Sequence, residues 1–146
     1  MKTLLTLTGA LALGASAAFA GEHASGDPEA GESVFNKCGS CHVIQSPDGE
    51  DIAGRGQAGP NLYGVAGRQA GTVEGYNYGD SIVAAGEAGL EWNEADFVTY
   101  VADPRGFLQE YNDDRRARSK MSFRLTNEQE AKDVWAYLAS FGDEAM

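Results

Sequence analysis

Cysteine and histidine, the usual ligands of zinc, are scarce in this chain. Its 146 residues include two cysteines and two histidines. A structural zinc site usually requires about four Cys or His ligands, and Cys38, Cys41, His23 and His42 are the whole supply. Basic residues are scarce as well, because 11 Lys and Arg stand against 22 Asp and Glu. The small ligand supply disfavours a zinc centre, and the acidic balance disfavours nucleic-acid binding.

The sequence also lacks a convincing membrane span. It opens with an apolar stretch from Leu4 to Phe19, which is too short and too rich in Ala and Gly for a typical span of ~20 strongly apolar residues. The stretch follows Lys2 and ends in Ala18-Phe19-Ala20, a small-x-small sequence typical of signal-peptide cleavage sites. An uncleaved N-terminal anchor is the alternative. We expect residues 1–20 to be a cleaved signal peptide, and residues 21–146 to form one domain in the periplasm.

The two cysteines lie in Cys38-Gly39-Ser40-Cys41-His42, and Cys-x-x-Cys-His is the attachment signature of a c-type haem. One helical turn would bring both thiols and the imidazole to the same edge of the porphyrin. A thioredoxin-like redox pair would need a preceding strand and a βαβ pattern, and neither is visible. The motif therefore predicts one haem c, bound covalently through Cys38 and Cys41, with His42 as an axial ligand to the iron.

Helical patterns predict an all-α fold of three to five helices, in which the first and last pack together and long loops surround the haem. Helices are expected from Asp27 into the haem motif, from Asp80 to Ala88, from Asn93 to Ala102 and from Thr126 to Phe141. The first should carry Val34, Phe35, Cys38 and Cys41 on its apolar side. Residues 45–80 and 105–125 are expected to be irregular, because a haem offers the chain an apolar surface to cover.

Capping residues support these boundaries. Asp27-Pro28 is typical of a helix start, and Asn93 stands three residues before Asp96 as in a capping box. Asp103-Pro104 should stop the third helix. The last helix is expected to begin with the capping box Thr126-x-x-Gln129 and to be closed by Gly142.

A second axial ligand is expected on the far face of the haem. Beyond the signal region the chain offers His23, Met121 and Met146. His23 lies in a polar lead-in and Met146 is the last residue, whereas Met121 lies in a loop ahead of the last helix. We therefore predict Met121 as the ligand. A neutral thioether favours Fe(II) and raises the reduction potential, and a haem with both axial positions filled suits electron transfer.

The chain resembles the class I c-type cytochromes, in particular the larger bacterial c2 and c-550 types. The resemblance runs from about Asp27 to Phe141. It rests on Phe35-Asn36-Lys37 before the haem motif, Gly59-Pro60-Asn61-Leu62-Tyr63-Gly64, Gly67-Arg68, Tyr76-x-Tyr78, Trp92, Tyr100, Asp103-Pro104, Lys120-Met121-x-Phe123 and Trp135-Ala136-Tyr137-Leu138. Segments 43–59 and 105–120 are longer than in the mitochondrial proteins, which fits the larger bacterial type.

The resemblance implies a role for each matching residue. The Pro60 carbonyl would accept a hydrogen bond from the His42 ring. Arg68, Tyr78 and Trp92 would hold a haem propionate. Tyr100 would lie near the Met121 sulfur, Ser119 would replace a usual Thr and keep its hydroxyl role, and Phe123 would cover the exposed haem edge. Gly31 and Phe35 would meet the last helix around Val134, Trp135 and Tyr137.

The resemblance further implies a soluble, monomeric periplasmic electron carrier that is not an enzyme. Its donor would be a quinol-oxidising cytochrome bc-type complex, and its acceptor a terminal oxidase or a photosynthetic reaction centre. Residues 105–124 hold six basic and three acidic side chains in an otherwise acidic molecule, and such a charge dipole can steer transient docking. Two alternatives are a haem sensor or peroxidase with a labile distal ligand, and a haem subunit of a membrane complex.

Overall fold

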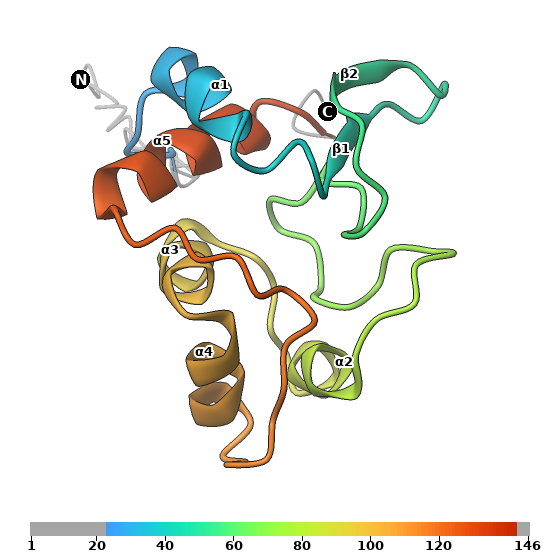
Figure 1. Ribbon diagram of the computed structural model, residues 1–146, viewed down its shortest axis with the longest axis vertical. Coiled ribbons are helices and arrows are strands. Elements are labelled where there is room, and N and C mark those ends of the chain that lie inside the picture. Colours follow the sequence, from blue (N-terminus) through green and yellow to red (C-terminus); the bar gives the residue numbers. More distant parts are fainter. Residues whose placement is uncertain (1–22, 143–146) are drawn as a thin grey trace, which may run out of the picture.

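Five helices and one short hairpin make up the computed structural model, which describes residues 23–142 (Figure 1). The elements are α1 Pro28–Phe35, β1 Val43–Gln45, β2 Asp51–Gly54, α2 Asp80–Glu87, α3 Glu94–Ala102, α4 Pro104–Tyr111 and α5 Glu128–Ala139. The predicted all-α class is therefore confirmed. The predicted signal peptide, residues 1–20, and Met146 lie outside the described residues. In the described part, every helix is too short or too polar to cross a membrane.

Helices α1 and α5 cross in close contact, as predicted (Figure 1). Gly31 makes the contact possible, because a Cβ atom there would lie only 2.0 Å from the main-chain oxygen of Asp133. The Phe35 and Tyr137 rings pack beside it with their centroids 5.9 Å apart. The Asp133 carboxylate accepts a hydrogen bond of 2.9 Å from the Asp27 N–H at the start of α1. A small residue and a buried carboxylate thus fix one helix on the other.

The structure corrects the expected start and end of α5. The side chain of Asn127, and not Thr126, caps the helix by accepting a hydrogen bond of 3.1 Å from the Glu130 N–H. Both residue types suit an N-cap, and Asn suits it at least as well. The helix ends at Ala139 with Ser140 as its C-cap, so Gly142 lies outside it, with a φ of +143°.

The prediction of a loop over 105–125 is wrong for its first third, because α4 occupies Pro104–Tyr111. Pro104 does end α3, as expected, but it also fits the first turn of a new helix, where no N–H is needed. Asp103 caps that helix by accepting from the Gly106 N–H at 3.2 Å. The irregular segment therefore begins only after α4.

Two more boundaries differ from the expected ones. Helix α1 ends at Phe35, so Cys38 and Cys41 lie in the turns that follow it and not in the helix. The region predicted to be irregular from residue 45 contains the second strand of an antiparallel hairpin, in which Val43 pairs with Gly54. Gly49, with a φ of +86°, lies in the connecting turn, and the turn signal Pro47-Asp48-Gly49 could have indicated the hairpin.

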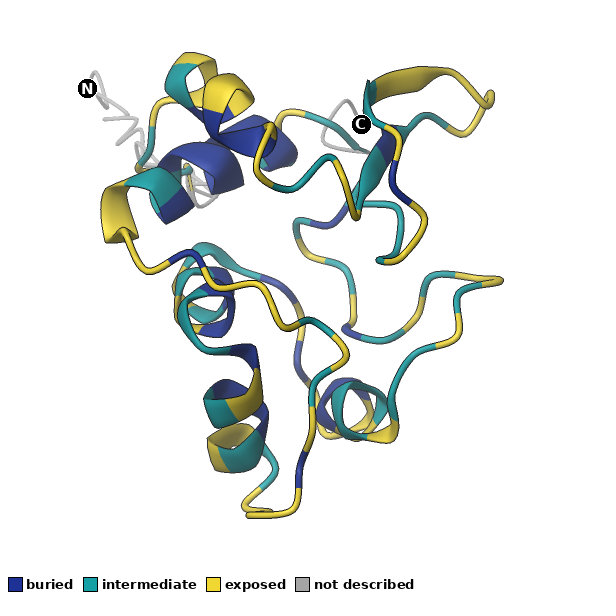
Figure 2. Ribbon diagram, in the orientation of Figure 1, coloured by how far each residue is buried: buried dark blue, intermediate teal, exposed yellow. Residues whose placement is uncertain are grey.

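Buried side chains gather where the helices face the loops. Figure 2 shows the inward faces of α1, α5, α3 and α4 buried, while the outward faces and loop tips are exposed. Aromatic rings link α3 to its neighbours, since Phe97 packs on Trp135 of α5 at 5.0 Å and Tyr100 packs on Phe107 of α4 at 5.7 Å. This arrangement leaves α2, the hairpin and the loops to enclose the other side of the molecule.

Replacing Gly31 with Ala should destabilise the protein by about 1–3 kcal/mol, because the added methyl would force α1 and α5 apart. At an open helical position the same change would stabilise by up to ~1 kcal/mol, so the sign of the effect tests the contact. Urea unfolding of the haem-loaded protein measures it, and Ser33→Ala, on the exposed face of α1, is the control. A higher free energy of unfolding for Gly31→Ala would contradict the close packing.

Candidate functional site

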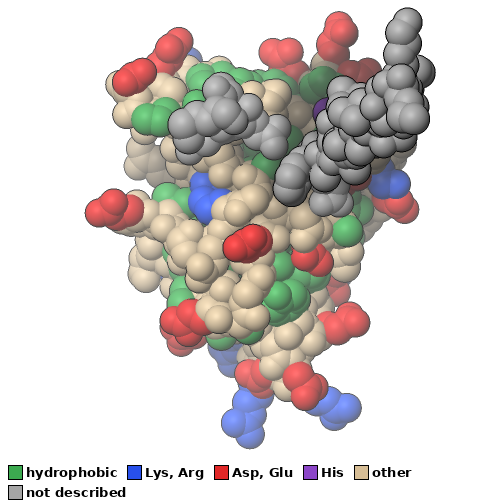
Figure 3. Space-filling view, turned by 180° about the vertical axis from the view of Figure 1, so that it is seen from behind, with side chains coloured by type: hydrophobic (Ala, Val, Ile, Leu, Met, Phe, Trp, Pro, Cys, Tyr) green, Lys and Arg blue, Asp and Glu red, His purple; other side chains and the backbone are tan. Residues whose placement is uncertain are grey.

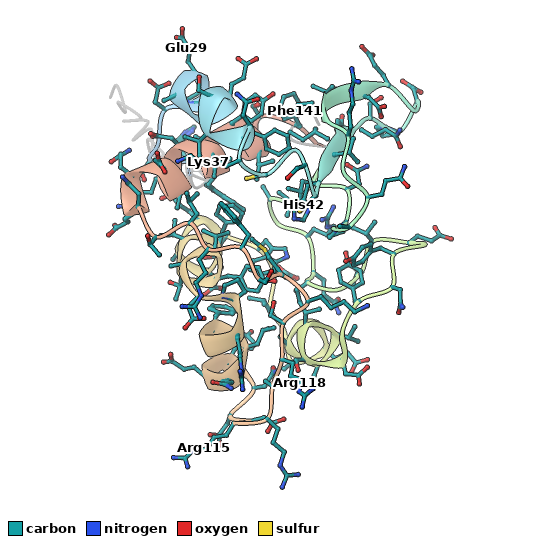
Figure 4. All side chains as sticks on the ribbon, viewed as in Figure 1. Glu29, Lys37, His42, Arg115, Arg118 and Phe141 are labelled. Atoms are coloured by element: carbon teal, nitrogen blue, oxygen red, sulfur yellow. The ribbon has the colours of Figure 1, made fainter. Side chains whose placement is uncertain are left out.

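A cavity of about 360 Å³ lies between the helices and the loops, a size typical of small-molecule and cofactor sites. All of the site residues predicted from the sequence line it. They are Cys38, Cys41, His42, Pro60, Arg68, Tyr78, Trp92, Tyr100, Ser119, Met121 and Phe123. These residues come from segments far apart in the chain, and Figure 4 shows His42 beside the central space between them. The fold therefore brings the predicted residues to one place.

The haem motif forms a tight turn at the cavity wall. The N–H groups of Cys41 and His42 both donate to the carbonyl of Cys38, at 3.0 and 2.9 Å. Within the described residues neither cysteine forms a disulfide, and Cys38 is half-buried while Cys41 is exposed. Burial raises the pKa of the Cys38 thiol to about 11, and the nearby Lys37 charge acts in the opposite direction. A redox-active pair needs a lowered thiol pKa, so this environment argues against the thioredoxin-like alternative.

The ring of His42 is held by the turn at Gly59-Pro60. Its Nδ1 lies 2.8 Å from the Pro60 carbonyl oxygen, which fits an Nδ1–H donor and leaves Nε2 free for another partner. Burial lowers the pKa of His42, so the imidazole is neutral at neutral pH, as a metal ligand must be. A Cβ at Gly59 would lie 2.3 Å from the His42 ring, so only glycine permits this contact.

Arg68 places a half-buried positive charge on the cavity wall. Its guanidinium donates to the carbonyls of Tyr63 and Asn61, at 3.0 and 3.2 Å, and in the described part of the chain it forms no ion pair with a carboxylate. Burial lowers the pKa of Arg68, with the phenol of Tyr78 acting in the opposite direction. A cation in such a place fits an anionic group within the cavity.

Tyr78 and Trp92 stand beside this charge on the wall. The Tyr78 oxygen accepts a hydrogen bond of 3.1 Å from the Val73 N–H, so its own proton remains available to an acceptor. The donor set of Arg68, Tyr78 and Trp92 thus fits a carboxylate such as a haem propionate. Together with the two thiols and the neutral imidazole, the wall has the chemistry that a covalently bound haem requires.

Met121 lies on the same cavity, in the segment between α4 and α5. Its N–H donates to the Ser119 hydroxyl at 3.1 Å, and that hydroxyl donates to the Met121 carbonyl at 2.9 Å. Tyr100 of α3 also faces the cavity, and its ring packs against Trp92 at 5.0 Å. Phe123, with 40% of its surface exposed, lines the cavity where it meets solvent. His23 is exposed and does not line the cavity.

Several wall residues were not predicted from the sequence. Most are apolar side chains from different elements: Leu62, Val65, Ile82, Phe97, Val101, Leu108 and Leu138. They carry no chemical signature, because the same residues would suit an ordinary core. Tyr76 also lines the cavity, and its hydroxyl donates to the Ala58 carbonyl at 2.7 Å. The Tyr-x-Tyr pattern indicated this residue, but only the fold shows that it braces the loop next to His42.

Replacing Tyr100 with Phe should reduce the amount by which the free energy of unfolding falls as the pH rises above about 10. Burial raises the pKa of Tyr100 above its ordinary value, whereas in the unfolded chain the phenol ionises near pH ~10. This difference stabilises the fold fully below pH ~10, and the stabilisation is lost as the pH rises through the folded pKa.

Urea-unfolding midpoints between pH 9 and 11 for the native protein and Tyr100→Phe measure this effect. Tyr111→Phe, at an exposed position on α4, is the matched control and should keep the native slope. Equal slopes for all three proteins would show that the Tyr100 phenol titrates as freely when folded as when unfolded.

Known proteins similar to this chain indicate its family. The family model for cytochrome c matches residues 28–142. Cytochrome c-551 of Roseobacter denitrificans is 54% identical over 136 residues, which cover 93% of this chain and 96% of the relative. Cytochrome c2 of Cereibacter sphaeroides is 52% identical over 132 residues, covering 87% and 91%. The crystal structure of cytochrome c2 from Rhodobacter sphaeroides matches with a TM-score of 0.78 at 50% identity, covering 80% of this chain and 97% of that one.

These similarities extend over the helices, the cavity and the haem motif together. Cytochromes of this family carry one covalently attached haem c and act as electron carriers rather than enzymes. The two thiols that such attachment needs lie in one turn at the cavity. The chain therefore binds one haem c, carries electrons rather than catalysing a reaction, and belongs to the cytochrome c family as a class I c-type cytochrome.

Proposed function

We propose that this cytochrome carries single electrons in the periplasm, with His42 and Met121 as the two axial ligands of its haem iron. The donor is a quinol-oxidising cytochrome bc-type complex, and the acceptor is a terminal oxidase or a photosynthetic reaction centre. One observation carries the proposal: a neutral imidazole and a thioether, from segments far apart in the chain, line the same cavity as the two cysteines. Residues 1–20 direct export and are removed.

Neighbouring residues orient each of the two proposed ligands. Cys38 and Cys41 would hold the haem through thioether bonds, and the Pro60 carbonyl orients the His42 ring through Nδ1, which leaves Nε2 free for the iron. Ser119 fixes the main chain of Met121 and thereby directs the thioether. A haem held by these residues supplies one-electron exchange between Fe(II) and Fe(III), and the neutral thioether favours the reduced state.

The cavity wall also controls the charge near the iron. Arg68, Tyr78 and Trp92 would bind a propionate and so offset its negative charge in a site of low polarity. With His42 and Met121 as its two ligands, the haem iron would offer no free position to peroxide or oxygen. This arrangement favours an electron carrier over the alternative of a haem sensor or peroxidase, which needs a labile distal position.

Docking occurs through a basic surface, defined here as Arg105, Arg115, Arg116, Arg118 and Lys120. Arg118 and Lys120 line the cavity, and Figure 4 shows Arg115 farther out, at the end of the molecule beyond α4. In Figure 3 basic side chains project from that end of the molecule beside acidic ones, and acidic side chains also lie over the rest of the face. Lys37 also lies at the cavity, but its charge is paired with Glu130 at 2.7 Å.

This distribution suits a brief encounter with an acidic partner. Steering by a charge dipole raises association rates and weakens with salt, because screening acts over ~10 Å at 0.1 M ionic strength. Redox encounters bury small interfaces, so the complex should form quickly and dissociate quickly. The protein acts as a monomer in this scheme, and each encounter would transfer one electron at the side of the cavity where Phe123 is exposed.

Replacing Arg115, Arg116 and Arg118 with Gln should slow association with the bc-type complex about tenfold at low ionic strength. The rates of variant and native protein should converge at high salt. Stopped-flow reduction of the haem by the purified complex measures both effects, and the haem spectrum of the variant should be unchanged, because the ligands are untouched.

Lys132→Gln is the control for the loss of a positive charge elsewhere on the molecule. Lys132 lies on α5 and pairs with Glu128 at 2.6 Å, away from the basic surface, so this variant should associate at nearly the native rate. If the triple variant also associated at the native rate in low salt, the basic surface would not be the docking face. If the complex failed to reduce even the native protein, the proposed donor would be wrong.

A further inference from the structure

The segment that carries Met121 is weakly attached to the rest of the molecule. Its flanks are firm: Ala117 is buried and its N–H donates to Asp114 O at 3.0 Å, while Leu125 is buried and its N–H donates to Val101 O at 2.7 Å. Residues 118–124 between them belong to no helix or strand. The position of the thioether therefore depends on whatever contacts hold this short span against the cavity.

A single main-chain hydrogen bond joins residues 118–124 to another element within residues 23–142. The Arg118 N–H donates to the hydroxyl of Ser81 at 3.0 Å. The bonds between Ser119 and Met121 lie inside the segment, so they shape it without attaching it. The Arg124 side chain pairs with Asp103 at 2.9 Å, but both side chains are about half exposed, and such ion pairs contribute little.

Ser81 is the second residue of α2 and makes two hydrogen bonds, one to residues 118–124 and one to the end of α4. Its hydroxyl accepts from the main chain of Arg118, and its carbonyl accepts a hydrogen bond of 2.8 Å from the Asn112 side chain at the end of α4. Lys120 reaches the same side of the molecule, where its ammonium donates to Asn77 O at 2.5 Å. The start of α2 is thus the support against which the segment rests.

Of these contacts, the Ser81 hydroxyl is the one that acts on the main chain close to the ligand. Arg118 is three residues before Met121, and Ser119 transmits its position through the two bonds to the Met121 main chain. Ser81 is half-buried, whereas Lys120 is an exposed side chain whose bond must compete with water. Loss of the Ser81 hydroxyl would weaken the attachment of residues 118–124, the ligand segment, while leaving the Asn112 contact to the Ser81 main chain in place.

We propose that Ser81 is a positioning residue for Met121: it keeps the ligand segment closed on the cavity and so limits the fraction of molecules in which the thioether is displaced. This inference rests on the proposed ligation by Met121. A segment with few attachments opens locally far more often than the whole protein unfolds. An added ligand that binds only the open state then has an apparent affinity set by the population of that state.

The experiment titrates the oxidised haem-loaded protein with imidazole, which competes with Met121, and follows the absorption spectrum. Ser81→Ala should raise the imidazole affinity roughly 2- to 10-fold, the range expected for the loss of one net hydrogen bond. Ser81→Thr keeps the hydroxyl and should restore the native affinity. Ser33→Ala, an exposed helical serine on α1, is the matched control and should leave the affinity unchanged.

The same titration in a Met121→Ala background separates this inference from the ligand assignment. Met121→Ala alone should bind imidazole far more tightly, and adding Ser81→Ala should then change nothing, because no thioether is left to position. If Met121→Ala did not raise the affinity, the ligand assignment would fail. If it did, but Ser81→Ala had no effect in the native background or the same effect in both, Ser81 would not position Met121.

Discussion

The close contact between α1 and α5 is the constraint on which the haem site depends. Gly31 allows the two helices to approach, and the Phe35–Tyr137 pair fills the space beside it. The haem motif follows directly after α1, and the segment with Met121 comes shortly before α5. Fixing these two helices therefore brings the segments that carry His42 and Met121 to the same cavity from distant parts of the chain.

Main-chain carbonyl groups orient several of the side chains at the site. The Pro60 carbonyl orients His42, and the carbonyls of Asn61 and Tyr63 hold the Arg68 guanidinium. Such contacts require the loops to approach side-chain rings very closely, and Gly59 permits this beside His42. Ser119 supports Met121 through its main chain, so irregular segments anchored by helices position both of the proposed ligands.

Predictions from the sequence were correct where a residue type has one main structural role. Asp27 and Asn93 were predicted as caps and do cap α1 and α3, and the Cys-x-x-Cys-His spacing led to the turn that lines the cavity. Predictions failed where one residue has two uses. Pro104 was interpreted as a stop, but it also starts α4, and either Thr126 or Asn127 could have capped α5. No local sequence pattern predicts the apolar cavity wall or the hydrogen bond to Ser81, because both arise from contacts between distant segments.

Whether His42 and Met121 both bind the iron is decided most directly by the absorption spectrum of the haem-loaded protein in its oxidised and reduced states. Sulfur ligation predicts a weak sulfur-to-ferric-iron charge-transfer band in the red region, which should vanish in Met121→Ala. It should persist in Ser122→Ala, a change at the exposed neighbouring position. If the native protein lacked the band and its reduced haem took up carbon monoxide readily, the distal position would be open, and the account of this protein as a His/Met-ligated carrier would be contradicted.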